Sequence, residues 1–255
     1  MASIQGVTSG VSTDYGQIAS GKRINSAADD ASGLAIAEKM ESQSNGLDVG
    51  AANAQSGIDA LNIADGALGG INDYLQRIYE LSVKASNGLN SGGDLRSMQK
   101  EVDQLMQGIT ETASNTEYNT LKLIDGSMAD MGLATNPDGT GQSIKMANAT
   151  LESLGIDGYD LTGDFDINRI TSAMDKVNEA RSAGGATTNA LEYAIDYNKY
   201  ASQNTTAAQS RIEDLDIPKA VSEQKKNEVL DEYQMMMQKR KMEEESNSVL
   251  GLFKF

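Results

Sequence analysis

The 255-residue sequence contains no cysteine, no histidine and no tryptophan. Without histidine or cysteine there is no thiolate nucleophile, no serine–histidine pair and no zinc site with nitrogen and sulfur ligands. No disulfide can support the fold in any compartment. The two prolines, at positions 137 and 218, leave long segments free to form uninterrupted helices. These absences exclude several catalytic and metal-binding chemistries, and we expect no catalytic residues, no cofactor and no metal ion.

Positive charge is scarce as well. Lysine and arginine number 21 against 37 aspartates and glutamates, which gives a net charge of −16. This excess argues against binding to nucleic acid or to an anionic membrane. No apolar run approaches the ~18 residues typical of a membrane span, so no membrane insertion is expected. The first residues, MASIQGVTSGVSTDYGQ, carry neither the basic nor the apolar region of a cleaved secretory signal.

The stretch from Ser26 to about Ser86 has apolar residues at alternating steps of four and three, which predicts one long helix with a heptad seam. Asp65 stands where one apolar residue is expected. Continuous, the helix would be roughly 85–90 Å long at 1.5 Å per residue. Ser26 and Asp29 resemble a capping box, with Asp29 and Asp30 in the first turn. The seam residues are Leu47, Ala51, Ala54, Ile58, Leu61, Leu68, Ile71, Leu75 and Ile78.

Turn-forming residues at 87–93 end this helix, and a second helix follows. A short connection between helices favours antiparallel packing of the second helix on the first. Helical spacing returns at Ile167 and continues to Leu215, and Pro218 marks a kink or a fresh helix start. Burying both seams places the C-terminal helix beside the N-terminal pair.

The middle of the chain, 122–165, loses helical periodicity. Residues 136–139, Asn-Pro-Asp-Gly, are a strong turn signal between Leu133 and the alternating pair Ile144 and Met146, which predicts one or two β-hairpins. The predicted class is therefore mainly α: an elongated antiparallel helical coiled-coil rod built from both ends of the chain, with a small β-hairpin region in the middle.

Three kinds of region follow from this pattern. Residues 21–121 and 166–218 form the helical rod domain, and 122–165 form the small β-hairpin or variable region. Residues 1–20 and 219–255 are terminal segments whose apolar residues lack an obvious partner within the monomer. Unpaired amphipathic ends are typical of self-assembling subunits, and a head-to-tail contact that does not close gives a filament.

Pairs of carboxylates offer two alternatives. Asp164 and Asp166 match the first half of a calcium loop, but Arg169 occupies the position that requires glycine. Asp164 with Asp166, or Asp214 with Asp216, would be the carboxylates of a hydrolase, although no cleft is predicted around them. We favour Asp164 or Asp166 as the cap of the next helix.

Several blocks, in order, resemble the bacterial flagellins. SGKRINSAADDASGLAIAEKM (20–40), NAQSGIDALNIADGAL (53–68) and LQRIYELSVKASNG (75–88) resemble successive N-terminal blocks of that family. NTEYNTLKLIDGS (115–127) is similar to the turn that closes its N-terminal half, and QNTTAAQSRIEDLDI (203–217) to the start of its terminal helix.

The resemblance implies a structural subunit of the flagellar filament, secreted and extracellular as part of the bacterial flagellum. Implied partners are other flagellin subunits in a helical homopolymer, the flagellar type III export apparatus, an export chaperone and the innate receptor Toll-like receptor 5. The family's receptor-binding and subunit-contact surface maps onto Leu75, Gln76, Arg77, Ile78, Tyr79, Glu80, Leu81 and Glu101.

Two departures from the family pattern affect the terminal segments. The stretch ahead of Ser20 is shorter than the family's usual leader by roughly two heptads. The last helix carries QKRKMEEE at 238–245, where flagellins usually continue in small and apolar residues. A minor flagellin or a hook–filament junction protein is therefore the alternative to a major filament subunit.

Overall fold

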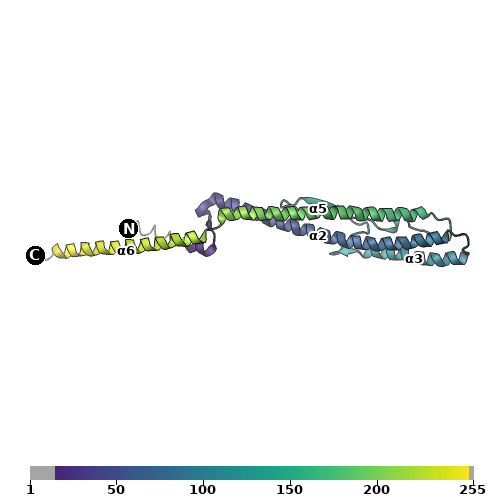
Figure 1. Ribbon diagram of the computed structural model, residues 1–255, viewed down its shortest axis with the longest axis horizontal. Coiled ribbons are helices and arrows are strands. Elements are labelled where there is room, and N and C mark those ends of the chain that lie inside the picture. The colour runs from purple at the N-terminus through teal and green to yellow at the C-terminus, as the bar shows by residue number, and fades with distance from the viewer. Residues whose placement is uncertain (1–14, 253–255) are drawn as a thin grey trace. The chain divides into compact units, whose positions relative to one another are not determined.

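The computed structural model describes residues 15–252, with side chains for residues 15–244 (Figure 1). The predicted class, mainly α with a small β-hairpin region, is confirmed. Contacts divide the chain into two units, residues 44–202 and residues 1–43 with 203–255. The helices are α2 (Ala27–Ala85), α3 (Gly92–Asn115), α4 (Leu151–Leu154), α5 (Ile167–Glu213) and α6 (Ile217–Leu252), and the strands are β1 (Glu117–Tyr118), β2 (Leu121–Lys122), β3 (Asp130–Ala134) and β4 (Gly141–Lys145).

In the unit of residues 44–202, α2 packs beside α5 in antiparallel fashion. The hydroxyls of Ser44 and Ser202 are 2.9 Å apart, and Arg181 Nε donates to Asp65 Oδ1 at 2.8 Å. From the first contact to the second, the chain advances along α2 by as many residues as it goes back along α5. They therefore fix the antiparallel register.

The heptad seam of α2 is buried as predicted, except that one seam position is occupied by a neighbouring residue. Its nine apolar residues are each no more than 8% exposed. The prediction that Asp65 occupies a seam position is wrong. Ala64 is 6% exposed and takes that place, whereas the Asp65 side chain is 51% exposed and pairs with Arg181. The seam shifts by one residue here, because a three-residue step from Leu61 keeps the buried face in line.

The predicted hairpin forms from β3 and β4, which pair antiparallel with Met131 opposite Ile144. Ile144 is fully buried and packs in a cluster with residues of α2 and α5. Asn198 of α5 donates its side-chain amide to the carbonyl of Thr135 at 2.8 Å, just beyond β3. The hairpin is thus tied to the long helices by both apolar packing and a buried hydrogen bond.

Three glycines of α2 let the hairpin approach the helix backbone. A Cβ added at Gly46 would lie 2.7 Å from Pro137 Cβ, and one at Gly57 would lie 2.3 Å from Leu133 Cδ1. At Gly50 it would lie 2.3 Å from the carbonyl oxygen of Thr135. At Gly46 and Gly50 a methyl group would meet the proline ring or the backbone of the hairpin and would displace it, whereas at Gly57 the end of the Leu133 side chain can move aside.

A second hairpin, β1–β2, was not predicted. It turns at Asn119 and Thr120, whose φ values are +47° and +67°. Two consecutive residues with positive φ are typical of a two-residue hairpin turn. Asparagine adopts this conformation readily but threonine does not, so the sequence carried only half of the usual signal.

The helix ends are capped by polar side chains. Ser91 and Asp94 form a capping box at α3, the Asp166 carboxylate accepts from Asn168 N at 2.9 Å at α5, and Asp216 accepts from Lys219 N at 3.2 Å at α6. Pro218 therefore lies in the first turn of a fresh helix, as one of the two predictions had it.

At the start of α2 one half of the predicted capping box forms, because the Asp29 carboxylate reaches back to the Ser26 amide. Asp29 accepts hydrogen bonds from the amides of Asn25 and Ser26 at 3.0 and 2.9 Å. Asp30 is not helical, with φ −161° and ψ 97°, and its carboxylate accepts from Gly33 N at 2.8 Å. Asp30 thus caps the continuous helix itself, because its extended backbone aims the carboxylate at the free amides of the first turn.

In the other unit, residues 21–25 pair with the turn between α5 and α6. Arg23 N donates to the Glu213 carbonyl at 2.6 Å, and Leu215 N donates to the Gly21 carbonyl at 2.9 Å. Lys22 Nζ lies 2.6 Å from Glu213 Oε1. Residues 15–20 are helical, and residues 1–14 and 253–255 of the terminal segments lie outside the described residues.

Candidate partner-contact surface

The residues expected to contact a partner lie near the C-terminal end of α2, and helix phase divides them into two sets. Leu75 and Ile78 are fully buried, and Leu81 is 3% exposed, within the core shared with α3 and α5. Those three side chains are inaccessible in this fold, because steps of three and four place them on the seam. The accessible set consists of Gln76, Arg77, Tyr79, Glu80 and the half-exposed side chain of Glu101.

Arg77 is the centre of the accessible set. Its guanidinium donates to Glu101 Oε1 of α3 from Nε at 2.8 Å and to Glu80 Oε2 from NH1 at 2.9 Å. The hydrogen bond to Glu101, followed by the one to Glu80, raises the pKa of Arg77 above its ordinary value. Because all three groups are exposed, the network orients the side chains more than it stabilises the fold. The result is a fixed fork, formed by the side chains of Arg77, Glu80 and Glu101, whose donors and acceptors are open to a partner.

A shallow hollow of about 460 Å³ lies over this network, between α2 and α3. Charged and polar groups line most of it. A lining of mixed charge suits contact with polar side chains of another protein rather than the enclosure of a small apolar ligand. The lining residues are Arg77, Glu80, Leu81, Lys84, Ser97, Met98 and Glu101.

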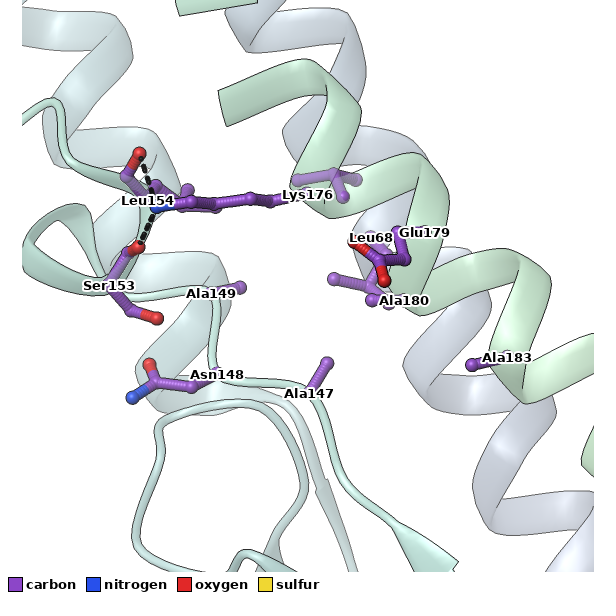
Figure 2. A pocket seen from close by; sticks show the side chains of 11 residues that line it. Leu68, Ala147, Asn148, Ala149, Ser153, Leu154, Lys176, Glu179, Ala180 and Ala183 are labelled. Carbon is purple, nitrogen blue, oxygen red and sulfur yellow. Dashed lines mark hydrogen bonds between the residues drawn. The ribbon is translucent and has the colours of Figure 1, made fainter. Parts of the chain in front are cut away.

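A second hollow of about 460 Å³ lies between α5 and the segment around α4 (Figure 2). Lys176 extends across it and donates to the carbonyls of Ser153 at 2.7 Å and Leu154 at 3.4 Å. A lysine at this position satisfies carbonyls at the C-terminal end of α4. Alanine and leucine side chains form much of the remaining wall, and the lysine is occupied in a structural role. We find no pair of nucleophile and base there.

Within residues 15–244, whose side chains are described, no group of three or more acidic side chains is placed to hold a metal ion. None of the helices within residues 15–252 is both long and apolar enough to cross a membrane. The calcium-loop alternative also loses its ligand, since Asp166 caps α5.

Exposed apolar side chains also gather on two helices, α6 and α5. On α6, within the predicted terminal segment, seven large apolar side chains are 41–64% exposed: Val229, Leu230, Tyr233, Met235, Met236, Met237 and Met242. On α5, Tyr193, Tyr197 and Tyr200 are 78%, 68% and 69% exposed. The sequence reasoning missed the tyrosines, although their spacing of four and three places them on one helix face away from the seam.

Comparison with known proteins identifies the family. Residues 1–129 match the bacterial flagellin N-terminal helical region, and residues 167–253 match the bacterial flagellin C-terminal helical region. A flagellin of Halalkalibacterium halodurans is 34% identical over 241 residues, covering 89% of this chain and 88% of that protein. The flagellar filament 33 kDa core protein of Treponema phagedenis is 35% identical over 236 residues, covering 84% of this chain and 82% of that protein.

Solved structures agree with this assignment. A Bacillus cereus flagellin aligns with a TM-score of 0.52 at 26% identity, covering 58% of this chain and 88% of that one. A protein described as a flagellar hook-associated protein of Vibrio parahaemolyticus aligns with a TM-score of 0.61 at 13% identity, covering 73% of this chain and all of that one, and this likeness concerns the fold alone. The fold and its exposed helical faces thus define a structural protein of paired helical ends. The chain belongs to the bacterial flagellin family, whose members are components of the bacterial flagellum.

Proposed function

We propose that this chain is a subunit of an extracellular flagellar filament and that it polymerises through its terminal segments, 1–20 and 219–255. The observation that supports this most directly is the apolar stripe of α6. Val229, Tyr233 and Met236 are 60–64% exposed and follow one another at steps of four and three. Packing such a stripe against another helix stabilises the contact by about 25 cal/mol for each Å² of apolar surface that it buries. Partner subunits are the occupants that family membership supports.

Seeded polymerisation tests this proposal. Purified chain is added to short fragments of its own filaments, and elongation is followed by electron microscopy. Replacing Val229 and Tyr233 together by serine should abolish elongation while leaving helix content unchanged, since both side chains are exposed. Leu89→Ser is the matched control, because Leu89 is 91% exposed but lies in the turn between α2 and α3.

The result of this experiment distinguishes a major filament subunit from a minor flagellin or junction protein. The proposal is supported if the parent chain elongates the fragments and the α6 double variant does not. A parent chain that binds fragment ends without elongating them would instead favour a minor flagellin or a hook–filament junction protein. Equal elongation by the parent and the double variant would overturn assembly through α6.

Export through the flagellar type III apparatus, assisted by an export chaperone, forms part of the same proposal and rests on family membership. Expression in a flagellated host with an inactive export gate should retain the chain inside the cell. Release into the medium at an unchanged rate would show another route.

We further propose that the free monomer is a ligand of Toll-like receptor 5, through the surface centred on Arg77. The supporting geometry is the fork of Arg77, Glu80 and Glu101, which is held by hydrogen bonds and open to solvent. Arg77→Ala should weaken binding to the receptor ectodomain at least several-fold, measured by titration calorimetry or surface plasmon resonance. Arg96→Ala, which removes an exposed arginine of α3 outside the network, is the control. Binding of the Arg77 variant as tight as that of the parent would refute the proposal.

A further inference from the structure

The tetrapeptide Ser-Asn-Gly-Leu occurs twice in the chain, at 44–47 and at 86–89. The two copies have different conformations. Asn45 lies inside α2, whereas Asn87 lies in the turn between α2 and α3. Both asparagines are exposed to solvent. Because the local sequence is identical, any difference in their chemistry must come from the fold.

The side chain of Asn87 and the amide of Gly88 differ in their hydrogen bonding. Leu89 N donates to Asn87 Oδ1 at 3.1 Å, which polarises the carboxamide carbon and would stabilise negative charge on that oxygen. Within the described residues, the amide of Gly88 donates to no acceptor. A Cβ added at Gly88 would meet no atom within 4 Å, so the peptide is open on that side. The attacking Gly88 nitrogen therefore has no hydrogen bond to give up, and the Asn87 carboxamide that it attacks is polarised.

From this arrangement we propose that Asn87 is a site of spontaneous deamidation, a covalent modification that Asn45 escapes. The amide nitrogen of Gly88 attacks Cγ of Asn87 and forms a new C–N bond, and its proton leaves with the side-chain nitrogen as ammonia. Water then opens the resulting five-membered imide at either carbonyl. The products are aspartate or isoaspartate at position 87, and water is the sole co-reactant.

Asn45 is protected by helical structure. The amide of Gly46 belongs to the hydrogen-bonded backbone of α2, so it is neither free nor able to rotate toward the Asn45 side chain. Gly46 also packs against Pro137, where even an added Cβ would lie 2.7 Å from Pro137 Cβ. Forming the imide at this position would require local unfolding of α2 and separation from the hairpin turn.

The modification would loosen the end of α2. The Asn87 carbonyl accepts from Asn90 N at 3.0 Å and from Asn90 Nδ2 at 2.9 Å, and Asn87 N donates to the Lys84 carbonyl at 3.2 Å. Isoaspartate inserts an additional carbon into the backbone at the centre of these bonds. Either product also places a negative charge beside the C-terminal carbonyls of α2, where the helix dipole disfavours it.

The test compares the two sites in one sample. The full chain is incubated at neutral and at mildly alkaline pH, and aliquots are digested and analysed by mass spectrometry for acid and isoaspartate at positions 45 and 87. A second sample in concentrated urea gives the rates without structure. In the unfolded chain the two rates should be similar. In the folded chain Asn87 should convert at least ten-fold faster than Asn45.

Gly88→Ala provides the matched variant. The site has space for the methyl group, and Gly88 lacks the positive φ that would strain alanine, so the fold should be unchanged. A side chain at position 88 hinders approach of its amide to Cγ, so conversion of Asn87 should fall several-fold. Similar rates at Asn45 and Asn87 in the folded chain, or an unmodified Asn87 after the unfolded control has converted, would overturn the proposal.

Discussion

The contact between the hairpin and α2 at Gly50 gives a sharp test of how this fold is built. A Cβ at this position would lie 2.3 Å from the carbonyl oxygen of Thr135 and 3.0 Å from Asn198 Nδ2. Gly50→Ala must therefore push the hairpin away from the helix. The same shift breaks the buried hydrogen bond of 2.8 Å from Asn198 to Thr135.

Opposing effects set the magnitude. Alanine is favoured over glycine within a helix by about 1 kcal/mol. Overpacking against backbone atoms typically costs about 1–3 kcal/mol, and loss of a buried hydrogen bond costs about 1–3 kcal/mol more. We therefore expect Gly50→Ala to lower the free energy of unfolding by about 1–5 kcal/mol.

Gly66 is the matched control, because it lies in the same helix and an added Cβ would meet no atom within 4 Å. Gly66→Ala should raise the free energy of unfolding by about 1 kcal/mol. Urea denaturation followed by far-UV circular dichroism measures both variants, and hydrogen exchange across 130–145 reports whether the hairpin has detached. A Gly50 variant as stable as the Gly66 variant, with unchanged exchange in the hairpin, would refute the close approach of hairpin and helix.

Three further predictions concern polar contacts. Tyr159→Phe removes the hydroxyl that donates to Ser82 Oγ at 3.0 Å in the core, and it should cost about 1 kcal/mol in urea denaturation. The hydrogen bond from Lys22 lowers the pKa of Glu213, so stability from this pair is present above the ordinary glutamate pKa and lost as pH falls through the lowered value. The protection factors of the backbone amides beside this pair, which are corrected for the intrinsic exchange rate at each pH, should therefore fall in acid, and Glu213→Gln should remove that dependence. Ser91→Ala removes the N-cap of α3 and should cost about 1 kcal/mol, whereas an unchanged denaturation midpoint would show that the cap contributes nothing.

The long helices could be predicted because their signal is local. Apolar steps of three and four along one segment define a buried face whatever covers it, and turn residues mark where the segment ends. Asp65 shows the limit of that reasoning. The local steps from Leu61 to Ala64 and on to Leu68 already continue the seam without Asp65, but the partner of Asp65, Arg181 of α5, lies far away in sequence. The same limit applies to Gly50, whose importance follows from the position of Thr135 and not from its neighbours in α2.

The partner-contact surface has a local part and a non-local part. The helical periodicity of α2 already separates Arg77 from the buried Leu75 and Ile78. Arg77 lies between these two seam residues in sequence, so its side chain points away from the core. The partner of Arg77 is set by the antiparallel register of α3, which brings Glu101 within 2.8 Å. A fixed fork thus requires both helices in register. A change that shifts α3 along α2 should alter this surface without touching any of its residues.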